Sequence, residues 1–228
     1  MSAYDFHIRL PPQPEMAEVQ LLQKVAATLG FAGLAIETSK ALTNGTVHEK
    51  LTIFRRVTLV PRSTARLRAQ VNKQTKDADL LVIHGRSKPI WLVAAEIPAV
   101  HMVMAKEIED FMVIDSQTAR AMANQNKPVE ICLHKLLVLK GAIRSRLMRV
   151  MNSAMDHLGR ADCPLILTSG ASGAYELRSP QDLMALSYLA SVPENLAKTA
   201  MRQESKALVS AIRHSTSAHP VGQIGREK

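Results

Sequence analysis

The sequence predicts a single-domain α/β fold in which parallel strands alternate with helices and close into a barrel. Three observations support this prediction. Short apolar runs of strand type recur along the 228 residues, segments with helical periodicity lie between most of them, and no linker or shift in composition divides the chain. Alternation of strands and helices favours a parallel sheet, and seven or more such units favour closure into a barrel. An open, doubly wound sheet is the alternative, because sequence does not show closure.

The predicted strands are short apolar runs bounded by Pro, Gly or polar residues, which is the pattern of buried strands. They cover residues 4–8, 32–36, 52–60, 79–83, 100–104, 129–133 and 165–168. The predicted helices place apolar residues three or four positions apart, so that one face of each can pack on a sheet. They cover residues 15–29, 63–73, 88–96, 116–125, 142–158, 180–189, 193–201 and about 203–214.

Several helix ends have clear sequence signals. Gly30 directly follows the first helix and suits the position after its last turn. Ser179, Pro180 and Asp182 provide a cap, a Pro at the first helical position and an acid near the positive end of the helix dipole. We therefore expect residues 1–214 to form the barrel domain. The Ser, Gly and Pro of residues 215–228 predict a disordered tail.

The charge balance favours a polyanionic partner. Lys and Arg number 29 against 20 acidic residues, which gives a formal net charge of +9 and a pI near 9.8. Nucleic acid is the commonest partner of such a surface, although a basic proteome would also produce it. Aromatic residues make up 4% of the chain. That content does not support a base-stacking groove, whereas recognition of folded RNA through backbone and shape needs few aromatic residues.

The sequence also suggests a compartment. Cys132 and Cys163 are far apart and form no CxxC or Cys/His ligand pattern, so we expect reduced thiols and no zinc site. The amino terminus lacks the basic and apolar regions of a signal peptide. No apolar run reaches the roughly 18 residues of a membrane span. We expect a cytoplasmic protein that does not bind membranes.

No pattern of catalytic residues emerges. The eight histidines show no HxH, HxxxH or HExxH spacing. The glycine-containing segment 169–173 follows a strand but lacks the Lys of a P-loop and the spacing of a dinucleotide fingerprint, so it is better explained as a structural turn. Ser169 or Ser172 as a nucleophile would lack an identifiable base. We therefore predict no catalytic residue and no metal ligand.

The basic residues gather in clusters near predicted strand ends. One cluster runs from Arg55 to Lys76, and another from Lys135 to Arg149. Solvated helix faces are the alternative explanation for such clusters. Arg86 and Arg178 lie in predicted strand-exit loops, where α/β folds place functional groups. A guanidinium in such a loop can bind phosphate through two parallel hydrogen bonds.

Residues 4–209 resemble the archaeal ribonuclease P protein component 3 family, which is of the p30 type. The most specific segment is PLILTSGASGAYELRSPQDLMAL at 164–186, supported by LGFAGLAIET at 29–38, by the segment that begins at Asp115, and by VEICLHKLL at 129–137 with the basic helix after it. Residues 4–9 also resemble the first motif of PHP-family metal-dependent phosphoesterases. Arg9 stands where that motif has its second histidine, and a guanidinium cannot ligate a divalent cation.

The resemblance implies a TIM-barrel-like (PHP-like) fold without the metal chemistry and without a cofactor of its own. It implies a non-catalytic subunit of an RNA-based enzyme that removes the 5′ leader of precursor tRNA, with magnesium on the RNA. The implied partners are the RNase P RNA, other RNase P protein subunits and a small RRM-like protein in a heterotetramer, with precursor tRNA met indirectly.

The residues that we predict to contact RNA phosphates are basic side chains near strand ends and on helix faces. They are Arg62, Arg86, Arg120, His134, Lys135, Arg144, Arg146 and Arg178. Two function classes compete with this prediction. One is a metal-dependent PHP-type phosphoesterase with unrecognised ligands, and the other is a barrel that binds only proteins.

Overall fold

Seven parallel strands lie side by side in chain order in the computed structural model, which describes residues 3–37, 51–75 and 78–218. The strands are β1 (Ala3–Arg9), β2 (Phe31–Glu37), β3 (Thr52–Leu59), β4 (Leu80–His84), β5 (Met102–Ala105), β6 (Val129–Cys132) and β7 (Leu165–Thr168). A doubly wound sheet would reverse its strand order at a switch point, and this sheet does not. Each strand instead pairs with its neighbour in sequence, as in a β/α barrel.

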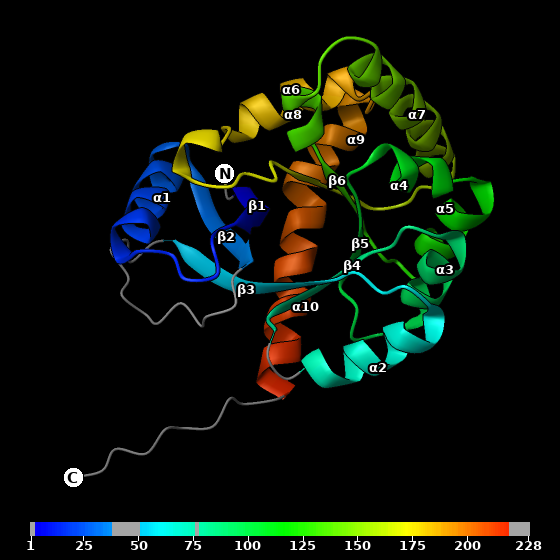
Figure 1. Ribbon diagram of the computed structural model, residues 1–228, viewed down its shortest axis with the longest axis horizontal. Helices are drawn as coiled ribbons and strands as arrows, with labels where there is room; N and C mark the ends of the chain where they lie inside the picture. Colours follow the sequence, from blue (N-terminus) through cyan, green and yellow to red (C-terminus); the bar gives the residue numbers. More distant parts are fainter. Residues whose placement is uncertain (1–2, 38–50, 76–77, 219–228) are drawn as a thin grey trace.

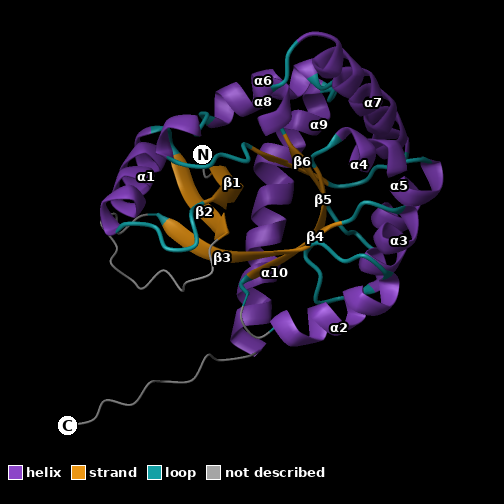
Figure 2. Ribbon diagram, viewed as in Figure 1, coloured by secondary structure: helices purple, strands orange, loops and turns teal. Residues whose placement is uncertain are grey.

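The sheet comes back on itself between β1 and the segment after β7. Ile8 forms an isolated parallel bridge with Ala171, and the Arg9 amide donates to the Ala171 carbonyl at 2.8 Å. Nearby, the Ser169 amide donates to Asp5 Oδ1 at 3.3 Å. These contacts make a nearly closed barrel (Figure 2). The barrel prediction is therefore confirmed, and the open-sheet alternative is wrong.

Helices surround the ring of strands (Figure 1). In chain order they are α1 (Met16–Thr28), α2 (Thr64–Gln74), α3 (Lys88–Glu96), α4 (Ile108–Val113), α5 (Ser116–Asn124), α6 (His134–Val138), α7 (Gly141–Arg160), α8 (Pro180–Leu189) and α9 (Glu194–Thr199), with a 3₁₀ turn η1 (Ala174–Glu176). The π-helical segment η2 (Ala200–Glu204) leads into α10 (Ser205–Ala218). Within the described ranges, none of these helices is long and apolar enough to cross a membrane.

The predicted start of α8 is confirmed in detail. Ser179 Oγ accepts from the Asp182 amide at 3.1 Å, and Asp182 Oδ2 accepts from the Ser179 amide at 3.1 Å. This reciprocal capping box satisfies two donors that the first turn would otherwise leave unpaired. At the end of α1, Gly30 has φ +88°, a conformation that costs other residues energy.

The final helix α10 differs from the others because it closes one end of the barrel instead of covering its outer face. Its apolar residues Leu208, Val209 and Ile212 pack with barrel-interior side chains, several of them near the amino ends of their strands. These interior residues are Phe6, Ala35, Phe54, Leu80, Val82, Met102, Met104 and Ile166. Helix α10 continues to Ala218, past the predicted boundary at residue 214. The rest of the predicted tail, 219–228, lies outside the described residues.

Gly170 lies at the seam of the barrel, where β1 meets the segment after β7. This position leaves no room for a side chain. Its φ is +65°, and a Cβ there would lie 2.5 Å from Cys132 Sγ. We expect Gly170→Ala to lower the free energy of unfolding by about 2–4 kcal/mol, through backbone strain and overpacking together. Urea denaturation measures the change. Gly173→Ala is the matched control, because a Cβ at Gly173 meets nothing within 4 Å. Equal stability of the two variants would contradict this account of the seam.

Candidate nucleic-acid interface

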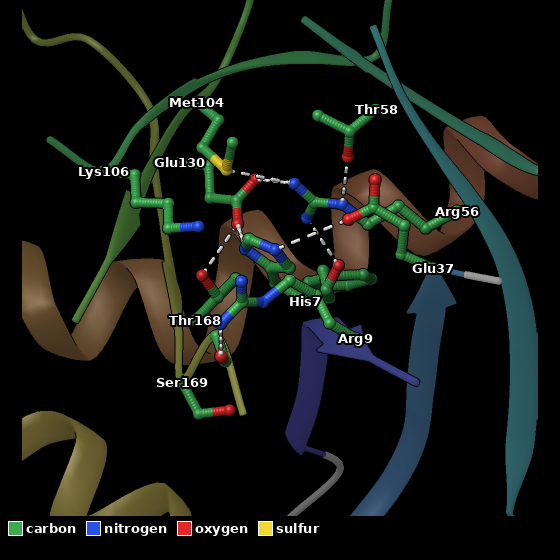
Figure 3. A network of polar contacts seen from close by, with 12 residues as sticks. His7, Arg9, Glu37, Arg56, Thr58, Met104, Lys106, Glu130, Thr168 and Ser169 are labelled. Carbon is green, nitrogen blue, oxygen red and sulfur yellow. Dashed lines mark hydrogen bonds and ion pairs between the residues drawn. The ribbon is translucent and has the colours of Figure 1, made fainter. Parts of the chain in front are cut away.

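A polar layer fills the barrel interior on the side away from α10, and the fully buried carboxylate of Glu130 is at its centre (Figure 3). Glu130 Oε1 accepts from Thr168 Oγ1 at 2.8 Å and lies 2.8 Å from His7 Nδ1. Glu130 Oε2 lies 2.8 Å from Arg56 Nη2. A charge buried in this way is tolerable only when it is paired and hydrogen-bonded.

The Arg56 guanidinium extends the layer across the barrel. It is fully buried, and its Nη1 donates to the Phe6 carbonyl at 2.7 Å. Its Nε donates to Thr58 Oγ1 at 3.0 Å, and Nη2 contacts Met104 Sδ at 3.3 Å. The Arg56 side chain on β3 therefore contacts residues of three other strands: Phe6 of β1, Met104 of β5 and Glu130 of β6.

The network fixes the charge of each member. Burial alone would raise the pKa of Glu130, but Arg56 and His7 outweigh that effect and bring the pKa to about 2. Burial, assisted by the Arg56 charge, lowers the pKa of His7 to about 4. At neutral pH the imidazole is therefore uncharged, and its Nδ1 lies beside the Glu130 carboxylate.

A second buried carboxyl supports the seam of the barrel. Asp5 Oδ1 accepts from the His7 amide at 3.2 Å and from the Ser169 amide at 3.3 Å. Burial raises the pKa of Asp5 to about 6, because these hydrogen bonds only partly compensate the lost hydration of its charged form. The loop after β7 is thus held to β1 by a carboxyl group whose pKa is about 6.

Arg9 occupies the place of the second histidine in the PHP-type motif, and its side chain also holds the seam. Its Nη2 donates to the Gly170 carbonyl at 3.3 Å and to Ser172 Oγ at 3.1 Å. Among the described residues, no group of three or more His, Cys, Asp or Glu side chains is arranged to hold a metal ion. The fixed positive charges of Arg9 and Arg56 beside His7 do not fit a divalent cation.

Most of the predicted RNA-contacting residues lie at the carboxyl end of the barrel. Arg62 follows β3, Arg86 follows β4, His134 and Lys135 follow β6, and Arg178 follows β7. The carboxyl ends of parallel strands meet at one end of a barrel, so these loops share it. We call these five residues, together with Lys106 after β5, the basic rim.

The remaining three predicted residues lie on outer helices. Arg144 and Arg146 are in the first turns of α7, and Arg120 is on α5. Helices of a β/α barrel run back against the strands, so the start of α7 lies toward the same end as the basic rim. Arg146 and Arg120 are exposed, whereas Arg144 is half-buried.

The side chains of the rim differ in how free they are to contact a phosphate. Arg62 and Arg86 are exposed. Lys135 Nζ lies 3.4 Å from Glu107 Oε2. Burial, with Arg9 and other nearby cations, lowers the pKa of His134, so this side chain is less readily protonated than an ordinary histidine.

The Arg178 guanidinium forms hydrogen bonds with the backbone of its own loop. Its Nη1 donates to the carbonyls of Tyr175, Glu176 and Leu177 at 3.4, 3.1 and 2.9 Å. This guanidinium is therefore partly engaged by the backbone around η1, and it fixes that loop at the rim.

Sequence reasoning missed the buried network and Lys106. The available signal was a charged residue inside a predicted buried strand: Arg56 in 52–60 and Glu130 in 129–133. Such a charge needs a buried partner, but sequence does not reveal which residue supplies it.

Comparison with known proteins identifies the family. A family model described as RNase P subunit p30 matches residues 2–216. The chain belongs to this family. Ribonuclease P protein component 3 of Methanosarcina mazei is 26% identical over 212 residues, which cover 90% of this chain and 88% of that protein. The corresponding protein of Methanosarcina barkeri is 26% identical over 205 residues, covering 87% and 84%. The predicted family resemblance is therefore confirmed.

Solved structures with the same fold confirm the β/α barrel. A chain in the cryo-EM structure of archaeal ribonuclease P with mature tRNA matches with a TM-score of 0.74 and 19% identity, over 97% of each chain. An amidohydrolase crystal structure matches with a TM-score of 0.56 and 13% identity, over 92% of this chain and 74% of that one. At these identities the likeness concerns the fold alone.

The buried ion pair predicts a large cost for removing one charge. We expect Glu130→Gln to lower the free energy of unfolding by about 3–5 kcal/mol, because it leaves the Arg56 charge buried without its counter-ion. The exposed pair between Asp156 and Arg160 on α7 provides the control, and Asp156→Asn should cost less than about 0.5 kcal/mol. Urea denaturation at pH 7 compares them. A Glu130→Gln variant as stable as Asp156→Asn would show that the network is dispensable.

The raised pKa of Asp5 predicts a pH-dependent difference between wild type and Asp5→Asn. The folded protein binds the Asp5 proton up to about pH 6, whereas the unfolded chain releases it near pH 4. Wild type therefore loses stability relative to the variant as pH rises from 4 to 6, by about 1.4 kcal/mol per pH unit. Unfolding measured at pH 4, 5, 6 and 7 tests this expectation. Parallel stability curves would mean that Asp5 does not titrate in this window.

Proposed function

We propose that this chain is a protein subunit of ribonuclease P that binds and stabilises the catalytic RNA, so that the RNA removes the 5′ leader from precursor tRNA. The observation that carries the proposal is membership of the RNase P p30 family over residues 2–216. The name of the Methanosarcina relatives and the fold shared with a chain of archaeal ribonuclease P support it.

The basic rim is the surface that we assign to the RNA. Its exposed guanidinium groups can neutralise phosphates and release condensed counterions, which is the main source of affinity for a nucleic-acid backbone. Arginine suits this role because its planar fork matches two phosphate oxygens. The start of α7 extends the surface through Arg144 and Arg146. Phosphate contacts of this kind position a folded RNA without reading its sequence.

We assign the chemistry of cleavage to the RNA and its own magnesium ions. In this barrel, the end that would hold the ligands of a PHP-type phosphoesterase contains Arg9 and the Arg56–Glu130 pair, which are structural contacts. We infer that the chain is a scaffold that needs no cofactor of its own. The phosphoesterase alternative gains no support from the arrangement of these residues.

The partners follow from the same proposal. We propose that the barrel of residues 1–214 joins the RNase P RNA, other RNase P protein subunits and a small RRM-like protein, with two copies of the small protein and two of this chain in a heterotetramer. We propose that precursor tRNA contacts the assembled complex and reaches this chain only indirectly. We place that complex in the cytoplasm. The family resemblance supports this set of partners.

The salt dependence of binding to RNase P RNA tests the rim. We expect Arg86→Gln and Arg146→Gln each to weaken binding and to reduce the slope of log affinity against log salt by about 1, the value for one lost phosphate contact. Filter binding between 50 and 300 mM KCl would measure the slope. Both side chains are exposed, so the unfolding midpoint should stay unchanged.

Arg160→Gln is the matched control, because Arg160 is an exposed cation at the other end of α7. It removes the same charge and should leave the slope as in wild type. Equal slopes for all four proteins would show that the RNA contacts neither Arg86 of the rim nor Arg146 on α7. Equal losses in all three variants would indicate a general charge effect.

A further inference from the structure

A pocket of about 380 Å³ lies at the opposite end of the barrel from the rim, where the start of β1 meets α10. It is lined by Tyr4, Lys206, Val209, Ser210, Arg213 and His214. Its volume is within the range of about 300–1,000 Å³ that small-molecule sites occupy. Figure 1 shows α10 running beside β1 at this end of the sheet.

The wall formed by α10 is a single helix face. Lys206, Ser210 and Arg213 follow one another at spacings of four and three, so their side chains lie along one side of the helix. All three are exposed. The neighbouring residues Leu208 and Ile212 pack into the barrel interior, which fixes the rotation of α10. One fixed face of α10 therefore presents two cationic side chains and a hydroxyl group to the pocket.

The opposite wall is an aromatic ring that is already held in place. The rings of Tyr4 and Phe6 stack with centroids 5.8 Å apart at an interplanar angle of 19°, and the Phe54 ring lies 6.5 Å from Tyr4. Tyr4 is half-buried, so its ring is supported from the barrel side while it lines the pocket. Binding against it costs little loss of side-chain freedom.

The combination of an apolar wall and cationic groups restricts the ligand. An inorganic anion would use Lys206 and Arg213 but not the ring of Tyr4 or the side chain of Val209. A purely apolar ligand would contact the Tyr4 ring but neither of the two cations. A nucleotide has a flat base for the aromatic ring and a phosphate for the cations. The low aromatic content of the chain argues against a stacking groove along many bases, but one nucleotide needs only one such ring.

We propose that this pocket binds one unpaired nucleotide of an RNA strand, with the base against Tyr4 and a phosphate at Lys206 and Arg213. The inference deepens the proposed function and rests on it, because it gives the RNA a second contact at the end of the barrel away from the rim. The two ends would bind RNA in different ways. The rim positions phosphates of folded RNA, and the pocket captures a single-stranded nucleotide.

Binding of a fluorescein-labelled single-stranded hexaadenylate to the full-length chain, followed by fluorescence anisotropy at 100 mM KCl, tests the pocket. We expect Lys206→Gln and Arg213→Gln each to weaken binding about tenfold, as for a lost charged hydrogen bond. Tyr4→Leu should weaken it by a similar factor and Tyr4→Phe should not, because the phenyl ring still stacks. Arg160→Gln, which removes the same charge outside the pocket, should leave the affinity within twofold.

Competition separates the possible ligands. Adenosine monophosphate should displace the hexaadenylate more strongly than adenosine or inorganic phosphate, because only the nucleotide engages both walls. Displacement by phosphate alone to the same extent would overturn the proposal in favour of a simple anion site. Displacement by a short peptide of alternating Asp and Phe, without displacement by the nucleotide, would assign the pocket to a protein.

The outcome for the pocket is distinguishable from that for the proposed function. Unchanged hexaadenylate affinity in Lys206→Gln and Arg213→Gln, or an equal loss in Arg160→Gln, overturns the pocket inference even if the rim variants behave as expected. Failure of the wild-type chain to bind RNase P RNA would instead overturn the proposed function. Because Lys206 and Arg213 are exposed, their variants should fold, and circular dichroism checks this.

Discussion

The ion pair between Arg56 and Glu130 is the interaction on which the rest of the barrel depends. Both groups are fully buried, and two desolvated charges are tolerable only if each keeps its partner and its hydrogen bonds. Arg56 meets this condition through the Phe6 carbonyl, Thr58 and Glu130. Glu130 meets it through a hydrogen bond from Thr168 and close contacts with Arg56 and His7. The pair therefore ties strands that are distant in sequence into one ring, and it specifies how they meet.

The same interior explains why we place the proposed RNA contacts on the outside of this barrel. The carboxyl end of the barrel interior holds a neutral His7, a Glu130 paired with Arg56, and the contacts of Arg9 with the loop after β7. Arg9 holds β1 to the loop after β7, whereas Glu130 contacts His7 of β1, Arg56 of β3 and Thr168 of β7. The charges that remain available lie in the loops around the carboxyl end and on the helices, where a large polyanion can reach them. A rigid interior and a basic exterior together suit a scaffold for RNA.

Much of the fold could be predicted from the sequence, because apolar runs and helix signals are local. The seven strands and the longer helices were placed within a few residues, and the limits of α3, α8 and β7 matched. The short helices α4 and α6 were not predicted from the sequence. The apolar face of α10 was visible, but periodicity does not say that this face enters the barrel. The pairing of Arg56 with Glu130 and the use of Arg178 by its own loop depend on tertiary geometry, and the RNA-contacting set stays a prediction.

Cleavage of precursor tRNA at limiting magnesium tests the central claim most directly. Ribonuclease P RNA with its other protein subunits would be assayed with this chain present, with it left out, and with the chain alone. The scaffold account predicts that the complete assembly cleaves at a magnesium concentration at which the incomplete one is nearly inactive, and that the chain alone cleaves nothing. Unchanged cleavage when the chain is left out, or cleavage by the chain alone, would contradict it.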